Sequence, residues 1–160
     1  MSDEVAYIMD SVLADVVRRG TGRNAYTALK REDLRGKTGT TNDQKDAWFS
    51  GFNPDLVATV WVGFDQPSTL GRREFGGTAA LPIWMNFMGA ALEGVPDREP
   101  RMPRGLVTAR IDPTTGRSAP PGTDGAFMEI FKQEDAPPPY SELEMGGYDS
   151  GGAVTPLELF

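Results

Sequence analysis

Histidine and cysteine are both absent from the 160 residues of this chain. Their absence excludes a Ser-His-Asp triad, a cysteine nucleophile, a disulfide and a zinc site with imidazole or thiolate ligands from this chain. The missing cysteines do not fix the cellular compartment, since many exported proteins also lack them. Covalent chemistry in this chain would depend on serine or threonine hydroxyls, lysine amines and carboxylates.

Basic residues are scarce in the last third of the chain. Residues 111–160 hold only Arg117 and Lys132 against nine acidic residues, and this imbalance equals the net charge of −7 of the whole chain. Ten of the 13 prolines follow residue 95. Residues 1–110 hold 14 basic and 14 acidic residues, so their charges balance. Charge and proline content predict a globular part, residues 1–94, and a Pro/Gly-rich acidic C-terminal extension, residues 95–160.

Three further absences concern partners and targeting. No basic stripe is present that would neutralise the phosphates of a nucleic acid. The longest uncharged stretch, residues 75–92, contains Pro82 and Asn86 and is typical of a loop followed by a buried helix rather than a membrane span. The first residues lack the basic-then-apolar order of a signal peptide. We therefore expect no nucleic-acid partner and no membrane contact by this segment.

Two segments have the pattern of long helices. Ser2 is a suitable N-cap for a helix over residues 3–19, which Gly20 would end. A second helix is predicted to begin at Pro82 and to end at Gly94, and residues 25–29 favour a short helical turn. Apolar residues at helical spacing predict one core-facing stripe on each long helix. These stripes are Val5, Ile8, Met9, Val12, Leu13 and Val16 on the first helix, and Ile83, Trp84, Phe87, Met88, Ala91 and Leu92 on the second.

Strand patterns lie between the two helices. β-Branched and aromatic residues predict strands over residues 35–41, 46–52 and 56–64, with residues 53–55 as a hairpin turn. A loop over residues 65–80 would precede the second helix. We expect Trp48, Phe49 and Trp61 to fill the core between sheet and helices. The order of elements predicts an α+β fold with an antiparallel sheet packed against helices.

The extension has weaker signals. Residues 106–111 and 127–131 are predicted to form short strands, with a turn at residues 112–116 after the first of them. Residues 136–152 have the composition of a disordered or extended segment. We therefore expect the extension to be largely irregular.

The segment Arg35-Gly36-Lys37-Thr38-Gly39-Thr40-Thr41 is the most informative in the chain. Its Gly-Lys-Thr tripeptide matches the last three positions of a phosphate-binding P-loop, but that motif needs a glycine where this chain has Arg31. Two interpretations remain for the motif alone: a Lys-Thr-Gly strand beside a serine nucleophile, and an ordinary surface strand with a bulge glycine. A strand edge offers backbone N–H groups to an acyl oxyanion and can pair with an extended peptide.

The side chains of this strand suit recognition of a terminal carboxylate. Glycine at position 39 leaves room for a ligand, while Thr38 and Thr40 supply hydroxyls and Lys37 supplies a cation. In an ideal strand Lys37 and Thr38 point to opposite faces, so we expect the strand to twist at the pocket if both are to contribute.

Several stretches beyond this motif, in the same order and spacing over about residues 1–95, resemble the transpeptidase domain of class A penicillin-binding proteins, closest to their 1A group in Gram-negative bacteria. The matching stretches are Asp15–Gly22, Gly36–Asp43, Asp46–Gly51, Thr59–Asp65, Leu70–Arg73 and Ala80–Trp84. The resemblance implies the penicillin-binding protein/serine β-lactamase-like fold, of which residues 1–94 would be a C-terminal portion.

Two motifs of that family are missing from this chain. None of its seven serines is followed by lysine three residues later or by asparagine two residues later. The Ser-x-x-Lys nucleophile motif and the Ser-x-Asn motif are therefore absent. In the family both precede Lys-Thr-Gly, so the resemblance implies that this chain is the C-terminal piece of a longer protein. A membrane anchor, a glycosyltransferase domain and the first part of the transpeptidase domain would lie upstream.

The resemblance also implies a function for the parent protein. It would be a D,D-transpeptidase that cross-links peptidoglycan at the periplasmic face of the inner membrane and is acylated by β-lactams. Lys37 would act in catalysis, while Thr38, Gly39 and Thr40 would bind the D-Ala-D-Ala stem peptide and the backbone N–H of Thr40 would be an oxyanion donor. No cofactor and no metal is implied. The isolated chain, without a nucleophile, is expected to be inactive.

Two alternatives remain open. A Lys-Thr-Gly strand followed by Trp-Phe-x-Gly also occurs in class D β-lactamases and penicillin-sensing receptors. Those chains usually end soon after their last helix, whereas this one continues well past Gly94. The second alternative is a non-catalytic interaction module whose acidic tail binds a partner.

Overall fold

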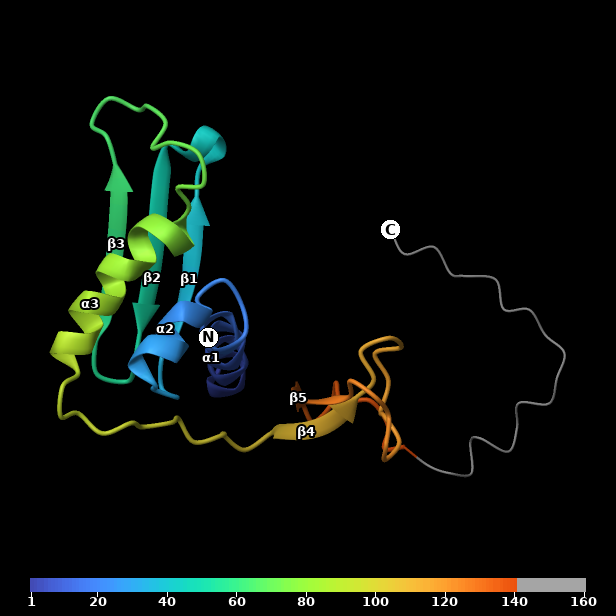
Figure 1. Cartoon of the computed structure of the whole chain (residues 1–160). Helices are drawn as coiled ribbons and strands as arrows, with labels where there is room; N and C mark the ends of the chain where they lie inside the picture. Colours follow the sequence, from blue (N-terminus) through green and yellow to red (C-terminus); the bar gives the residue numbers. More distant parts are fainter. Residues whose placement is uncertain (141–160) are drawn as a thin grey trace, which may run out of the picture. The chain divides into compact units, whose positions relative to one another are not determined.

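A computed structural model describes residues 1–140 of the chain (Figure 1). The chain divides into two compact units, Met1–Arg104 and Gly105–Phe160. In the described part of the chain, no helix is both long and apolar enough to cross a membrane.

Helices α1 (Asp3–Arg18) and α2 (Arg23–Leu29) form the N-terminal part of the first unit. The Ser2 hydroxyl accepts a hydrogen bond from the Val5 N–H at 3.4 Å, and Asp3 and Glu4 lie in the first turn, where carboxylates stabilise the positive end of the helix dipole. The predicted helix over residues 3–19 is thus confirmed. The short turn expected at residues 25–29 is a helix that begins two residues earlier.

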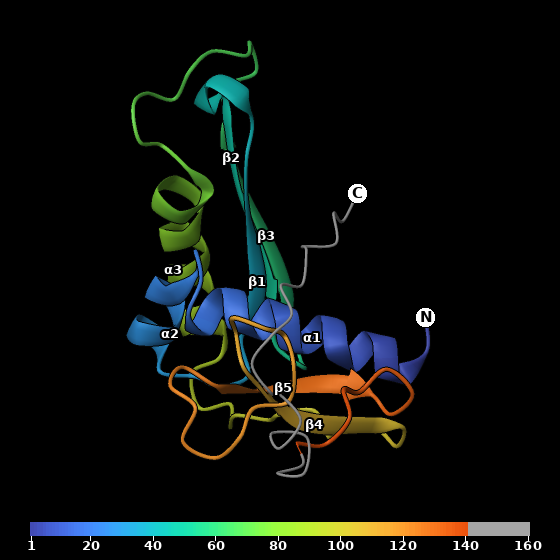
Figure 2. The same cartoon turned by 90° about the vertical axis from the view of Figure 1, so that its right-hand side faces the viewer.

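An antiparallel sheet of strands β1 (Arg35–Thr40), β2 (Asp46–Phe52) and β3 (Val57–Gly63) follows, in the spatial order β1-β2-β3. All three predicted strands are confirmed. The Asn53 side chain closes the β2–β3 turn, because its Oδ1 accepts the N–H groups of Asp55 and Leu56. Seen from the side, α2 and α3 (Leu81–Ala91) lie on one face of the sheet (Figure 2).

The core lies between that face and the helices. Ala47, Phe49 and Gly51 alternate along β2 as buried residues. The Phe49 ring meets the ring of Trp84 edge-on, with centroids 4.9 Å apart, and Trp84 Nε1 donates to the Ala58 carbonyl at 3.0 Å. Trp84 therefore fixes α3 on the sheet by both packing and a hydrogen bond.

The expectation that Trp48 and Trp61 fill this core is wrong; only Phe49 of the three aromatic residues does so. Trp48 and Trp61 pair across β2 and β3, with ring centroids 6.1 Å apart, on the opposite face of the sheet, where they are 41% and 44% exposed. The reason is the two-residue period of a strand, which places neighbours Trp48 and Phe49 on opposite faces.

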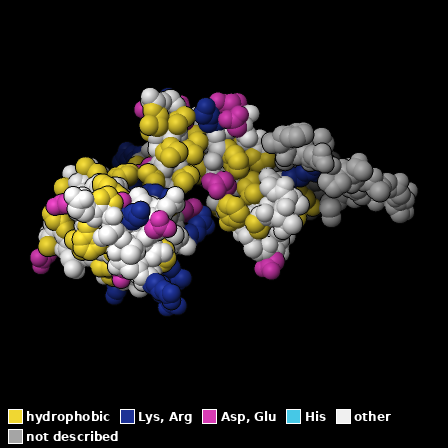
Figure 3. Space-filling view, turned by 90° about the horizontal axis from the view of Figure 1, so that it is seen from above, with side chains coloured by type: hydrophobic (Ala, Val, Ile, Leu, Met, Phe, Trp, Pro, Cys, Tyr) yellow, Lys and Arg dark blue, Asp and Glu magenta, His cyan; other side chains and the backbone are white. Residues whose placement is uncertain are grey.

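The expected apolar stripes of both long helices need correction as well. The fully buried residues of α1 are Ala14 and Val17, whereas Met9 and Val12 are about half exposed. On α3, Trp84, Met88 and Leu92 are buried, but Ile83 and Phe87 are half exposed and Ala91 is exposed. Each apolar stripe is wider than the strip that the sheet covers, so hydrophobic side chains remain at the surface (Figure 3).

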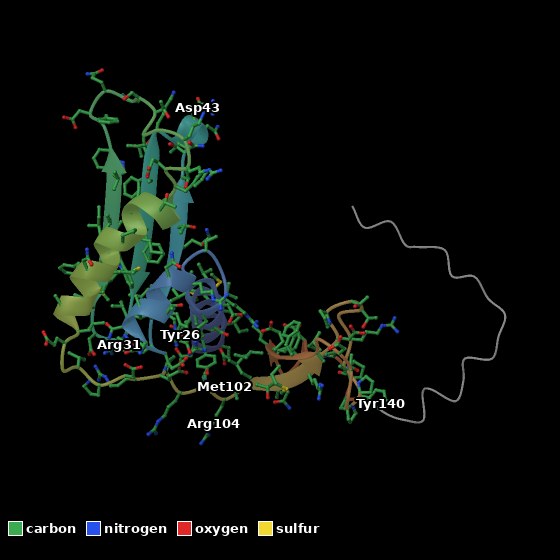
Figure 4. All side chains as sticks on the ribbon, in the orientation of Figure 1. Tyr26, Arg31, Asp43, Met102, Arg104 and Tyr140 are labelled. Carbon is green, nitrogen blue, oxygen red and sulfur yellow. The ribbon has the colours of Figure 1, made fainter. Side chains whose placement is uncertain are left out.

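The last part of the segment predicted as a loop, residues 65–80, is helical. Gly76–Ala80 form a wide helical turn, η2, which runs directly into α3. The turn starts where the Phe75 N–H donates to the Thr78 hydroxyl at 2.8 Å, and Thr78 donates in turn to the Arg73 carbonyl. A shorter turn, η1 (Asn42–Gln44), connects β1 to β2. Asp43 in this turn and Arg31 lie at opposite ends of the sheet (Figure 4).

Residues 95–104 belong to the first compact unit, although composition places the boundary after residue 94. Arg31 donates to the Val95 carbonyl at 2.7 Å, and the Glu32 N–H donates to Asp97 at 2.9 Å. The Arg98 N–H approaches the buried Asp33 carboxylate at 3.3 Å. These bonds hold a segment that lacks helix and strand against the first unit.

The described part of the second unit is built on a hairpin of β4 (Leu106–Ile111) and β5 (Phe127–Lys132), which confirms both predicted strands. The Asp112 carboxylate starts the predicted turn by accepting from the Thr114 N–H at 2.8 Å and from the Thr115 hydroxyl at 3.0 Å. Residues 136–140 form neither helix nor strand, and the rest of the segment predicted over 136–152 lies outside the described residues.

Candidate functional site

Strand β1 carries the four residues predicted to form the site. Its pairing with β2 sets which side each one faces: Thr38 lies opposite Phe49, on the helix side, while Lys37 lies opposite Ser50 and Gly39 opposite Trp48. Thr40 shares the helix side with Thr38. The threonines and the lysine therefore start from opposite faces of the strand, as the two-residue period requires.

Lys37 nevertheless reaches Thr38. Its Nζ donates to the Thr38 carbonyl at 2.9 Å and approaches the Thr38 hydroxyl at 3.4 Å. Since β1 has no partner strand on its second edge among the described residues, the lysine side chain can bend around that edge. The length and flexibility of the lysine side chain allow its ammonium to reach Thr38 from the other face of the strand.

The Thr38 hydroxyl has a second neighbour, which sequence reasoning missed. Thr21 Oγ1 lies 2.9 Å from Thr38 Oγ1. Thr21 follows the end of α1, where the Gly22 N–H donates to the Val16 carbonyl at 2.9 Å. Gly20 lies so close to α1 that an added Cβ would come within 2.9 Å of the Val16 backbone, so only glycine permits this tight return. The sequence predicts that Gly20-Thr21-Gly22 is a helix stop and a loop at the rim of the pocket, but it does not predict the contact between Thr21 and Thr38.

Thr40 is held by η2. The Gly76 N–H donates to Thr40 Oγ1 at 3.1 Å. A Cβ on Gly76 would lie 2.3 Å from the Trp48 carbonyl oxygen and 2.7 Å from that of Gly39. Glycine at position 76 therefore allows η2 to press against the backbone of β1 and β2, which brings its N–H to the threonine hydroxyl.

These groups line a cleft of about 460 Å³. Its lining residues come from the loop after α1, from α2, from β1 and from η2, and they are Thr21, Asn24, Thr38, Thr40, Phe75, Gly76, Gly77 and Thr78. The structure thus brings the predicted Thr38 and Thr40 into one cleft, whereas Lys37 and Gly39 are not part of its lining. Asn24 and the residues of η2 are far from β1 in the sequence, and no local pattern marked them.

A larger cleft, of about 710 Å³, lies elsewhere in the first unit. It is lined by Arg18, Arg19, Arg23, Tyr26, Thr27, Lys30 and Glu32, none of which belongs to β1. Tyr26 donates to Glu32 at 2.7 Å, and this hydrogen bond raises the pKa of the Tyr26 hydroxyl above its ordinary value. Arg18 there pairs with Glu32 and Glu99, and Arg19 pairs with Asp15, so size alone does not make this cleft the candidate site.

The cleft at β1 can bind an anion next to an open strand edge. The hydroxyl of Thr40 accepts from a backbone N–H, which can only donate, so its own proton is available to a ligand. The Thr38 hydroxyl and the Lys37 ammonium lie beside it as further donors. Two hydroxyls and a cation suit a carboxylate, and an exposed strand edge suits an extended peptide. Among residues 1–140 no group of acidic side chains is arranged to hold a metal ion.

Similar proteins and a similar solved structure share one name. No family model matches the chain. Penicillin-binding protein 1A of Pseudomonas aeruginosa is 60% identical over 97% of this chain, and the match covers 19% of that protein. The penicillin-binding proteins 1A of Neisseria lactamica and Neisseria gonorrhoeae are 56% and 54% identical over 64% and 65% of this chain, and 13% of each is covered.

A solved structure is similar too. The 2.6 Å crystal structure of penicillin-binding protein 1A from Haemophilus influenzae matches with a TM-score of 0.79 and 36% identity, over 88% of this chain and 22% of that one. The chain therefore spans about a fifth or less of the length of the curated relatives that it matches.

Proposed function

Because this chain belongs to the penicillin-binding protein 1A family, whose C-terminal part it matches, we propose that it supplies one wall of the active site of a peptidoglycan D,D-transpeptidase. In this proposal residues 1–94 are the C-terminal portion of the transpeptidase domain and residues 95–160 are an extension. The observation that supports it most directly is the convergence of Lys37, Thr38 and Thr40 beside a cleft, at the edge of β1 that has no partner strand within residues 1–140.

The proposed substrate is the D-Ala-D-Ala end of a stem peptide. Its terminal carboxylate would accept hydrogen bonds from the Thr38 and Thr40 hydroxyls, with the Lys37 ammonium adding charge. Its extended backbone would lie along β1, and Gly39 presents no side chain at that edge. The Thr40 N–H would donate to the oxyanion that forms on the attacked carbonyl. A β-lactam presents the same carboxylate and a reactive carbonyl.

The proposed reaction proceeds in two acyl transfers. A serine oxygen attacks the carbonyl between the two D-alanines, the C–N bond breaks, and the serine proton leaves on the amine of the released D-alanine. An amine of a second stem peptide then attacks the ester, its proton returns to the serine oxygen, and a new amide cross-link forms. No serine of this chain lies in the Ser-x-x-Lys motif, so the nucleophile would come from upstream sequence.

The remaining parts of the proposal concern the parent protein. It would carry a membrane anchor, a glycosyltransferase domain and the first part of the transpeptidase domain upstream, and would act at the periplasmic face of the inner membrane. This chain would then need that upstream part as its partner to complete the sheet and the active site.

The test uses a hybrid protein in which this chain replaces the matching C-terminal segment of the full-length Pseudomonas aeruginosa relative. We expect the hybrid to be acylated by a fluorescent penicillin and the isolated chain to remain unlabelled. Replacing Lys37 by alanine should slow acylation by roughly 10- to 100-fold, since a lost hydrogen bond from a charged group costs about 1.5–3 kcal/mol. Lys45→Ala, which removes an exposed lysine with only a 3.8 Å contact to Asp43, is the matched control.

Two results would contradict the proposal. One is a folded hybrid that is acylated equally fast with and without Lys37. The other is a penicilloyl adduct found by mass spectrometry on any serine of this chain.

A further inference from the structure

Thr21 stands outside the proposed catalytic residues, yet it makes a side-chain contact inside the cleft. Its hydroxyl is 2.9 Å from that of Thr38, and the two residues are 17 positions apart. Thr21 is otherwise exposed, in a loop whose path is fixed by the tight return at Gly20 and Gly22. The structure thus brings a loop hydroxyl to a strand hydroxyl.

A threonine hydroxyl has one proton to donate and two lone pairs that accept. The Lys37 ammonium has protons only and can do nothing but donate to Thr38 Oγ1, at 3.4 Å. The pair formed by Thr21 and Thr38 has two polarities. If Thr38 donates to Thr21, the Thr38 oxygen presents only lone pairs to the cleft, which repel a carboxylate. If Thr21 donates to Thr38, the Thr38 proton is free for a ligand.

At the neighbouring Thr40, the hydroxyl oxygen is the acceptor and its proton is free for a ligand. Its oxygen accepts from the backbone N–H of Gly76 at 3.1 Å, and a backbone N–H has no alternative role. The two hydroxyls that face the cleft from β1 thus each have a hydrogen-bonding partner from another segment. For Thr40 that donor is a peptide N–H, whereas for Thr38 the partner is the Thr21 hydroxyl, which can either donate or accept.

We propose that Thr21 is a positioning residue for carboxylate recognition: it donates to Thr38 Oγ1 and so directs the Thr38 proton to the carboxylate of the ligand. This inference rests on the proposed function, because it takes the carboxylate of a stem peptide or β-lactam as the ligand. Thr21 touches no reacting atom and acts through Thr38 alone. Its effect is therefore on binding of carboxylate ligands and not on the acyl-transfer step.

The experiment compares two ligands on the hybrid protein: benzylpenicillin and its methyl ester, which lacks the anionic carboxylate. Thr21→Val removes the hydroxyl and keeps the shape of the side chain. We expect it to raise the benzylpenicillin concentration needed for half-maximal acylation by about 3- to 10-fold, the effect of one neutral hydrogen bond. The limiting acylation rate, and both constants for the ester, should change by less than about twofold, because the ester does not depend on that hydrogen bond.

Four further variants make the result specific. Thr21→Ser keeps a hydroxyl and should restore benzylpenicillin binding, whereas Thr21→Ala should behave like Thr21→Val. Thr27→Val removes an exposed hydroxyl on α2 that bonds only to its own helix, and should leave both ligands unaffected. In a Thr38→Val background, Thr21→Val should have no further effect, since residues that act as one unit are not additive.

The outcomes separate this inference from the function on which it rests. Equal losses for benzylpenicillin and its ester, or no loss for either, would overturn the role of Thr21 while Lys37→Ala still slows acylation. An additive effect in the Thr38→Val background would overturn it as well. If Lys37→Ala has no effect, the proposed function itself fails.

Discussion

Asp33 is a buried carboxylate in the first unit, outside the candidate site. The Asp33 side chain has no exposed surface and accepts from Arg31 at 2.8 and 2.9 Å and from Asn53 at 3.3 Å. Burial acts to raise the pKa of this carboxyl, but the hydrogen bonds from Arg31, Asn53 and the Arg98 N–H, with the charge of Arg31, lower it below its ordinary value.

The direction of that pKa shift fixes a dependence on pH. A carboxyl with a lowered pKa in the folded state contributes stability above its unfolded pKa, near 3.8, and this stability is lost as pH falls through the folded value. We expect Asp33→Asn to lower the free energy of unfolding of the hybrid by about 3–5 kcal/mol at pH 7, because it leaves Arg31 without its buried partner. The difference from the unsubstituted hybrid should narrow below about pH 4.

Urea unfolding at pH 7 and at acid pH measures this difference. Asp43→Asn, in the exposed turn η1, is the control and should change the stability little at either pH. A constant difference between Asp33→Asn and the unsubstituted hybrid over the whole pH range would show that the carboxylate charge is not the cause.

Among the elements, η2 matters most to the site. This short turn lies against the backbone of β1 and β2 and supplies the N–H that backs Thr40. Its contact depends on the absence of a side chain at position 76, where a Cβ would meet two carbonyl oxygens of the sheet. Main-chain atoms in a sheet cannot move aside as the end of a flexible side chain can.

Gly76→Ala is therefore expected to displace η2 from the sheet. We expect a loss of about 2–3 kcal/mol in unfolding free energy from the forced shift of backbone. Penicillin acylation should slow as well, because Thr40 loses its donor. Gly89→Ala is the matched control: its Cβ would meet only a methyl group of Leu29, at 3.1 Å, and should cost less than about 1 kcal/mol. Normal acylation by a folded Gly76→Ala hybrid would show that η2 does not support the site.

The chain divides into its two compact units after Arg104, whereas composition alone places the boundary after residue 94. Residues 95–104 share the proline-rich composition of residues 105–160, yet they are bound to Arg31, Glu32 and Asp33 of the first unit. Truncation can separate the contribution of residues 95–104 to the stability of the first unit from that of residues 105–160. Deleting residues 105–160 from the hybrid should leave the unfolding free energy of the first unit nearly unchanged. Deleting residues 95–160 should lower it by roughly 2–4 kcal/mol, from the loss of three hydrogen bonds to buried or charged groups.

Thermal and urea unfolding of the two truncated hybrids provide the measurement. Equal stability of both would mean that residues 95–104 add nothing to the first unit. A loss that already appears on removal of residues 105–160 would place the stabilising contacts in the second unit instead.

Local patterns were sufficient for most of the fold. The helix over residues 3–19, the three strands of the sheet and the hairpin strands of the second unit were all predicted from caps, periodicity and turn residues, which act between near neighbours in the sequence. It was harder to predict which face of each helix and strand is covered by other elements. The expected core included Trp48 and Trp61, and the helix stripes included Met9 and Ile83, because a local pattern shows where apolar residues lie but not what packs on them.

The sequence by itself determined the chemistry that this chain can offer. Without histidine, cysteine or a Ser-x-x-Lys motif, it can contribute hydroxyls, a lysine and a strand edge but no nucleophile of the expected kind, and the Lys-Thr-Gly segment marked where they would lie. Only the tertiary structure decided how these groups meet. Lys37 reaches Thr38 around a free edge, Thr21 approaches from the end of α1, and Gly76 backs Thr40 from a turn 36 residues later. Such contacts depend on the relative placement of whole elements, which no short stretch of sequence encodes.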